Sequence, residues 1–176
     1  MPITLNGNGT VTGITAGITQ GVTQADEWRV SADYNVTTSE ATITSNWERN
    51  DTNFSYVGSG MTESSGIFTF PATGIYLIMF GMGFYDSNTQ IRYGGIYCKA
   101  TTDSFSSVTN KLNENLSSLS NDASAYTSVS GHAIFDVTNV STHKVKFDVV
   151  AEVACTGQGS SGSNRTYATF IRLGDT

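Results

Sequence analysis

Residues 75–84 (IYLIMFGMGF) constrain the fold more than any other part of the sequence, because they are apolar on both faces of an extended strand. Alternate side chains of a strand point to opposite sides, so Ile75, Leu77 and Met79 share one face. The other face carries Tyr76, Ile78, Phe80, Met82 and Phe84. An antiparallel sheet in a sandwich packs only one face on the core. The second face needs another cover, and a further copy of the chain is the simplest one.

The composition favours an all-β protein. The 176 residues include 25 Thr, 21 Ser and 18 Gly but only 2 Pro. Thr suits strands, whereas Ser and Gly suit turns. Strand-like segments separated by turn signals recur from Trp28 onward, which predicts a two-sheet sandwich without a helical domain. In residues 101–122, the spacing of Leu112, Leu116 and Leu119 allows a short helix, and the Ser and Asn content allows a loop.

The strand predicted over residues 144–155 alternates between apolar and polar side chains. Its core face carries Val145, Phe147, Val149, Ala151, Val153 and Cys155. Its opposite face carries Lys144, Lys146, Asp148 and Glu152. This pattern is typical of a half-buried antiparallel strand with one face in water.

The charge of the chain restricts its partners. The net charge is −6, from 9 basic and 15 acidic residues, and no run of Lys or Arg is present to neutralise phosphates. The longest apolar run, residues 75–80, is too short to cross a bilayer. Residues 1–9 lack the basic start and apolar core of a secretory signal. We therefore predict no nucleic-acid partner and no membrane insertion.

The residue types that carry catalysis are scattered along the sequence. His132 and His143 stand neither in a zinc-ligand pattern nor beside a Ser or Cys nucleophile. Residues 157–162 match the dinucleotide pattern G-x-G-x-x-G, but a strand and not a helix is expected to follow. No spaced calcium motif joins the loop carboxylates of Asp103, Glu114, Asp122 and Asp136. We predict a protein that is not an enzyme and holds no metal or cofactor.

Two pairs of side chains keep alternatives open. Trp28 and Trp47 can stack on a sugar ring, or they can belong to the core or an interface, which is the commoner role. Cys98 and Cys155 can form a disulfide, or they can remain buried free thiols. For the tryptophans we favour the core or an interface, and for the cysteines we favour free thiols.

Residues 1–25 differ from the rest of the chain. Residues 3–23 carry no charge and no aromatic side chain, and Gly recurs every four residues from Gly9 to Gly21. Such a segment cannot bury enough apolar area by itself to offset the entropy lost on ordering. Its Ile and Val content favours an arm that orders against other subunits over a free tail. We predict a docking arm over residues 1–25 and one β domain over residues 26–176.

Residues 64–78 (SSGIFTFPATGIYLI) carry a family motif. Its pattern, G-x-F-x-x-P-x-x-G-x-Y, is matched by Gly66, Phe68, Pro71, Gly74 and Tyr76, and it resembles the signature of the tumour necrosis factor superfamily and the complement-q globular head. Residues 130–137, 144–147 and 166–173 resemble the last strands of that family. Physically, Pro71 ends one strand, Gly74 permits the turn into the next, and the aromatic side chains meet across a hairpin.

The resemblance implies an all-β, ten-strand antiparallel jelly-roll sandwich that assembles as a homotrimer. Members of the family close the three-fold axis with apolar residues three and five positions after the turn glycine, and with a tyrosine of the last strand. Leu77, Met79 and Tyr167 occupy those positions in this sequence. Leu77 and Met79 also belong to the face of residues 75–84 that needs a second cover. The resemblance and the residue pattern thus indicate the same surface.

Residues 3–14 (ITLNGNGTVTGI) resemble the start of tail-fibre and related virion proteins of tailed bacteriophages. We interpret the chain as a non-enzymatic virion protein, a trimeric tail or head fibre or capsid decoration subunit. Its arm is expected to dock on other virion proteins, and its loops 101–122 and 156–165 to contact a host-surface glycan or protein. The alternative is a soluble carbohydrate- or ligand-binding jelly-roll module. A polysaccharide-cleaving enzyme is disfavoured because the acidic residues are scattered.

Overall fold

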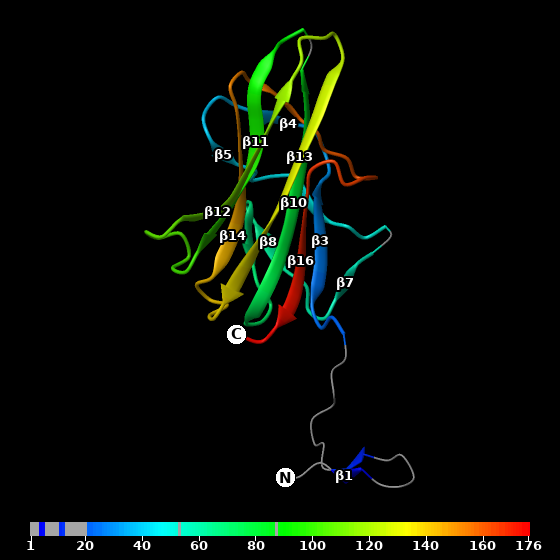
Figure 1. Ribbon diagram of the computed structural model, residues 1–176, viewed down its shortest axis with the longest axis vertical. Coiled ribbons are helices and arrows are strands. Elements are labelled where there is room, and N and C mark those ends of the chain that lie inside the picture. The colour runs from blue at the N-terminus through cyan, green and yellow to red at the C-terminus, as the bar shows by residue number, and fades with distance from the viewer. Residues whose placement is uncertain (1–3, 6–10, 13–20, 53, 87) are drawn as a thin grey trace.

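The structure, a computed structural model, describes residues 4–5, 11–12, 21–52, 54–86 and 88–176 (Figure 1). These ranges contain strands and turns and no helix, so none that is long and apolar enough to span a membrane. The strands form a two-stranded, an eight-stranded and a six-stranded sheet. The two larger sheets face each other as the layers of a sandwich, which confirms the all-β prediction.

The strands are β1 (Thr4–Leu5), β2 (Val11–Thr12), β3 (Ala25–Val30), β4 (Tyr34–Val36), β5 (Ala41–Thr42), β6 (Trp47–Arg49), β7 (Tyr56–Val57), β8 (Thr62–Ser64), β9 (Ile67–Thr69), β10 (Gly74–Asp86), β11 (Ile91–Thr101), β12 (Asn110–Leu119), β13 (Ala125–Val137), β14 (Lys144–Ala151), β15 (Cys155–Gly157) and β16 (Tyr167–Gly174). The sequence predicts ten strands, whereas the described residues form sixteen. The difference arises because segments of two or three residues, such as β5 and β7, pair with the longer strands.

The eight-stranded sheet, the β10 sheet, has the order β4-β15-β10-β16-β3-β6, with β13 paired to β10 and β7 to β3. The six-stranded sheet, the β11 sheet, has the order β12-β11-β14-β9-β8, with β5 paired to β14. Every pairing between these strands is antiparallel. β1 and β2 pair with each other. Most of the predicted arm lies outside the described residues, and β3 begins at Ala25.

The core lies between the two sheets and is rich in aromatic rings. The inward face of β10 is the predicted one, and each of its side chains is at most 1 % exposed: Tyr76, Ile78, Phe80, Met82 and Phe84. Trp47 and Trp28 pack edge-on against Phe68, with ring centroids 5.1 and 5.5 Å away. Trp47 is buried in the core and Trp28 is partly buried against it, so the core interpretation is correct for both.

The family motif carries the chain between sheets and does not form the expected hairpin. β9 belongs to the β11 sheet, whereas β10 belongs to the β10 sheet. Phe70 and Tyr76 still meet, with ring centroids 4.7 Å apart, and the Tyr76 hydroxyl donates to the carbonyl of Ala72 at 3.0 Å. Gly74 has φ +142°, and a Cβ there would lie 2.5 Å from the carbonyl oxygen of Gly174. Only glycine fits this close approach of β10 to β16.

Two predictions of local structure are wrong. Residues 110–119 form the strand β12, neither a helix nor a loop, because β11 offers a partner along their length. The strand predicted over residues 144–155 ends at Ala151, and Cys155 starts β15 in the other sheet. The alternation of apolar and polar residues continues from β14 through the link to β15. The sequence pattern therefore cannot show that the chain passes from one sheet to the other there.

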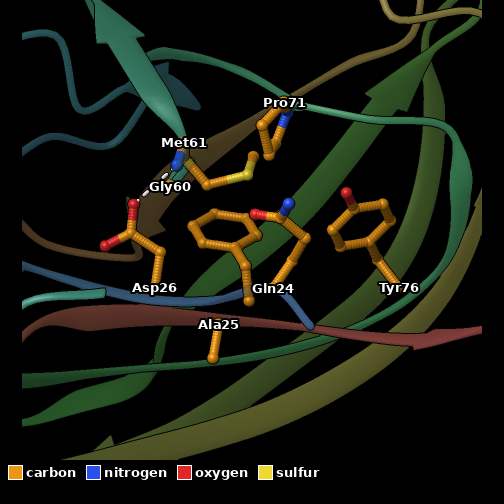
Figure 2. A pocket seen from close by; sticks show the side chains of 8 residues that line it. Gln24, Ala25, Asp26, Gly60, Met61, Pro71 and Tyr76 are labelled. Atoms are coloured by element: carbon orange, nitrogen blue, oxygen red, sulfur yellow. Dashed lines mark hydrogen bonds between the residues drawn. The ribbon is translucent and has the colours of Figure 1, made fainter. Parts of the chain in front are cut away.

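Asp26 anchors the edge of the core, although it is a buried carboxylate at 2 % exposure. Its oxygens accept hydrogen bonds from the Arg49 side chain (Nε at 3.0 Å), the Trp28 indole (2.9 Å) and the backbone N–H of Met61 (2.6 Å), the last drawn in Figure 2. The cavity in this view is apolar and measures about 10 Å³. It has room for at most one water molecule, so it is a packing gap and not a ligand site.

Both cysteines are buried free thiols. Burial raises the pKa of the Cys98 thiol. Burial, with a smaller contribution from the charge of Asp86, raises the pKa of Cys155 to about 11. Both groups are therefore protonated near neutral pH and are poor nucleophiles.

Candidate assembly interface

The outward side of the β10 sheet presents an apolar surface that no part of the described chain covers. We call it the outer β10 face and define it by Leu77, Met79, Ile134, Tyr167 and Ile171. The register brings these residues together, because Leu77 pairs with Ile134 on β13 and with Ile171 on β16. Side chains of directly paired residues lie on the same side of a sheet. The face predicted from the alternation of residues 75–84 is therefore real.

All three residues predicted for the trimer interface line one open hollow on this face. Leu77, Met79 and Tyr167 surround it together with Ser130, Gly131, His132 and Ile134, and it measures about 570 Å³. The Tyr167 ring lies against β10 at Gly81, where a Cβ would come within 2.9 Å of the ring. Glycine at this position thus leaves room for the Tyr167 ring. The structure places the three predicted side chains together, while their role in a trimer stays a prediction.

Ile134 is the main residue of this face that the sequence analysis missed. It is 63 % exposed, whereas Leu77, Met79 and Tyr167 are half-buried by their neighbours. The signal was present in the strand itself, because Ala133, Phe135 and Val137 are buried and Ile134 is the one aliphatic side chain in the outward row of β13. An aliphatic side chain this exposed, next to the apolar side chains of Leu77, Met79 and Tyr167, indicates a surface that is covered in the functional protein.

A polar network bounds the outer β10 face along β3. Glu27 accepts hydrogen bonds from Asn50 at 2.5 Å and from Asn164 at 2.7 Å. Arg29 pairs with Glu48, with 2.7 Å between Nε and Oε1, and is 3 % exposed. The apolar surface therefore ends in satisfied polar groups, as the centre and rim of a protein interface do.

The outward side of the β11 sheet has the opposite character, because it is charged. Asp148 pairs with Lys99 at 2.9 Å and with Lys146 at 3.6 Å, and Glu40 also contacts Lys99. Burial by itself would raise the pKa of Asp148, but the hydrogen bonds from Lys99 and Thr42 and the Lys146 charge bring it below its ordinary value. The predicted polar face of β14 is thus correct, although Asp148 is 4 % exposed and not in water.

The described residues offer no group of His, Cys, Asp and Glu side chains that could hold a metal ion within one chain. In these ranges no three His, Cys, Asp or Glu side chains come together. The G-x-G-x-x-G match begins at the last residue of β15 and is followed by the strand β16.

The Asp103 carboxylate accepts hydrogen bonds from Ser107 and Thr101, which lower its pKa to about 2 and hold the turn after β11.

Comparisons with known proteins identify the fold. No protein-family model and no curated protein matches the sequence. Among solved structures, murine APRIL is 15 % identical, with 85 % of this chain and 98 % of that chain covered, at a TM-score of 0.61. Eiger TNF from S. frugiperda is 14 % identical over 86 % and 93 % of the two chains, at 0.62. PRD1 vertex protein P5 is 17 % identical over 88 % and 99 %, at 0.52. The chain has a tumour necrosis factor-like jelly-roll fold.

Proposed function

We propose that this chain is the subunit of a homotrimeric, non-enzymatic structural protein of a virion. The observation that carries the proposal is the outer β10 face, an exposed apolar surface on a protein whose opposite sheet is charged. The likeness of the fold to a vertex protein supports a structural role in a virion. The resemblance of residues 3–14 to the start of tail-fibre proteins supports the same role. Trimer, virion location and host attachment are parts of this one proposal.

Covering the outer β10 face supplies the free energy of assembly. Full burial of a Leu, Ile or Met side chain contributes about 1.5–3 kcal/mol relative to full exposure. Ile134 gains most of that amount because it is 63 % exposed, whereas half-buried Leu77 and Met79 gain a smaller part. In a closed ring of three subunits, each subunit makes the same contact with its neighbour. The outer β10 face of every subunit is then covered, and no apolar patch is left for further association.

The N-terminal arm is proposed to connect the trimer to other virion proteins. Gln24 belongs to the sandwich, because its carbonyl accepts from the backbone N–H of Arg172 at 2.9 Å and its side chain accepts from the backbone N–H of Ser59 at 2.9 Å. Deletion of residues 1–22 is therefore expected to leave a folded trimer that no longer joins the particle. Mass spectrometry of virions assembled with the truncated protein, and sedimentation of the isolated protein, measure the two effects. Normal incorporation of the truncated protein would contradict a docking role.

The two ends of the sandwich can be distinguished by which strands begin or end there. β3 begins and β16 ends at one end, where Ala25 pairs with Ile171 (Figure 1). The loop 102–109 lies at this arm-proximal end, because Ser104 bonds to Thr142 in the turn between β13 and β14. The turn 120–124 and the loop 158–166 lie toward the other end, where β10 finishes. We propose that these two segments, and not residues 102–109, contact the host surface.

Deletion of residues 161–163 together with Asp122→Ala is expected to lower adsorption to host cells at least several-fold without changing trimer mass. These positions are exposed, whereas Gln158 and Ser160 are tied by backbone hydrogen bonds to Gly83 and Val30. The matched control is Thr102→Ala with Thr109→Ala, two exposed positions at the arm-proximal end. Adsorption assays on virions that carry each variant measure the effect. Equal adsorption of the variant and the control would leave only the structural role.

A further inference from the structure

His132 lies on the outer β10 face, beside Met79. It pairs with Met79 across β10 and β13, and it lines the same hollow as Leu77, Met79 and Tyr167. Its side chain is exposed. Among the residues that line the hollow, it is the one His, Cys, Asp or Glu. Any copy of the chain that covers the predicted interface residues therefore also covers this imidazole.

The imidazole has no partner of its own to satisfy it. In the part of the chain that the structure describes, its backbone carbonyl accepts from Asn113, but neither ring nitrogen makes a hydrogen bond. The neighbouring side chains of Met79, Leu77 and Ile134 offer no strong donor or acceptor. A polar group that loses its water without a new partner costs about 1–3 kcal/mol. Where a second copy of the chain excludes water from the face, that copy or a bound ligand can supply the partner.

Three-fold symmetry determines which groups are available. In the proposed trimer the outer β10 faces meet around a three-fold axis, and a residue near such an axis faces two copies of itself. Because His132 pairs with Met79 on this face, that trimer would bring three imidazoles to one place. Three neutral imidazole nitrogens with one further position open to water form a set of ligands that Zn²⁺ and similar divalent ions accept. The hydroxyl of Tyr167 lines the same hollow and can hydrogen-bond to a metal-bound water.

On the basis of the proposed trimer, we infer that three His132 side chains, one from each subunit, bind one divalent transition-metal ion such as Zn²⁺ or Ni²⁺ where the outer β10 faces meet. No single chain contains the site, which is why the sequence spacing of the two histidines gives no zinc pattern. The ion satisfies all three imidazoles at once and links the subunits through them.

The test uses the untagged full-length protein after removal of metal with EDTA. Isothermal titration calorimetry with NiCl₂ and with ZnCl₂ is expected to show one ion bound per three chains. Cobalt substitution is expected to give visible absorption bands of a low-coordinate Co²⁺ site. His132→Asn, which keeps a polar side chain of similar size, is expected to remove both signals. Ser130→Ala, a change in the same hollow that removes no ligand, is expected to keep them.

The outcomes separate the metal site from the trimer. A trimer by sedimentation that binds no ion, binds one ion per chain, or binds equally well after His132→Asn overturns the metal site and leaves the proposed trimer intact. A monomer by sedimentation overturns both. Binding of one ion per trimer that is lost in His132→Asn and kept in Ser130→Ala supports the site.

Discussion

Leu77→Asp is expected to abolish the trimer and to yield monomer or aggregate at every concentration. Leu77 lies at the centre of the outer β10 face, paired with Ile134 and Ile171. An aspartate there would be buried by the neighbouring subunit among the apolar side chains of the outer β10 face. The cost of burying an unpaired carboxylate exceeds the 1.5–3 kcal/mol or so that a buried leucine contributes. Size-exclusion chromatography with light scattering measures the mass of the species formed.

The matched control for this variant is Leu116→Asp. Leu116 is 45 % exposed and lies on β12, in the other sheet, so the same substitution there is expected to leave the trimer unchanged. Leu77→Ala provides a milder variant that keeps the face uncharged, and it is expected to raise the dissociation constant of the trimer without unfolding the subunit. If Leu77→Asp and Leu77→Ala both remain trimeric, the outer β10 face is not the interface.

Asp26→Asn is expected to lower the free energy of unfolding by about 3–5 kcal/mol, the usual cost of removing one member of a buried ion pair. The carboxylate accepts from the Arg49 guanidinium, the Trp28 indole and the Met61 backbone. The substituted amide would turn an N–H₂ group toward these donors, so at least one bond is lost and the Arg49 charge is left unpaired. Urea unfolding, with wild type and variant at equal protein concentration, measures the change.

Lys111→Ala serves as the control for Asp26→Asn, because it also removes one side of an ion pair. Lys111 and Glu114 are each 40 % exposed, at 2.9 Å. Exposed pairs contribute at most about 1 kcal/mol, so this variant is expected to unfold close to wild type. An equal loss in the two variants would show that Asp26 is not a structural anchor.

The sequence predicted the inner and outer faces of β10 correctly, because the alternation of side chains is local and both faces are strongly marked. The family resemblance implied a trimer-interface role for Leu77, Met79 and Tyr167. These residues share one hollow in the structure, and their role in a trimer stays a prediction. Ile134 was missed because residues 130–137 were interpreted only through their resemblance to the family's strands, although Ile134 is the most exposed aliphatic residue of the face.

Other features could not be predicted because they depend on pairing between distant segments. The strand β12 is polar and its leucines have helical spacing, so only β11 as a partner explains its conformation. The break between β14 and β15 is hidden by continuous alternation. Burial of Asp148 requires Lys99 and Thr42, which lie 49 and 106 positions away in the chain. Ion pairs of this kind leave no periodic signal.

Sedimentation equilibrium of the untagged wild-type chain, from micromolar down to nanomolar concentration, tests the assembly most directly. The outer β10 face predicts a single species of about three times the chain mass of 18.8 kDa across this range. A folded species with the mass of one chain, or a dimer that does not associate further, would contradict the trimer.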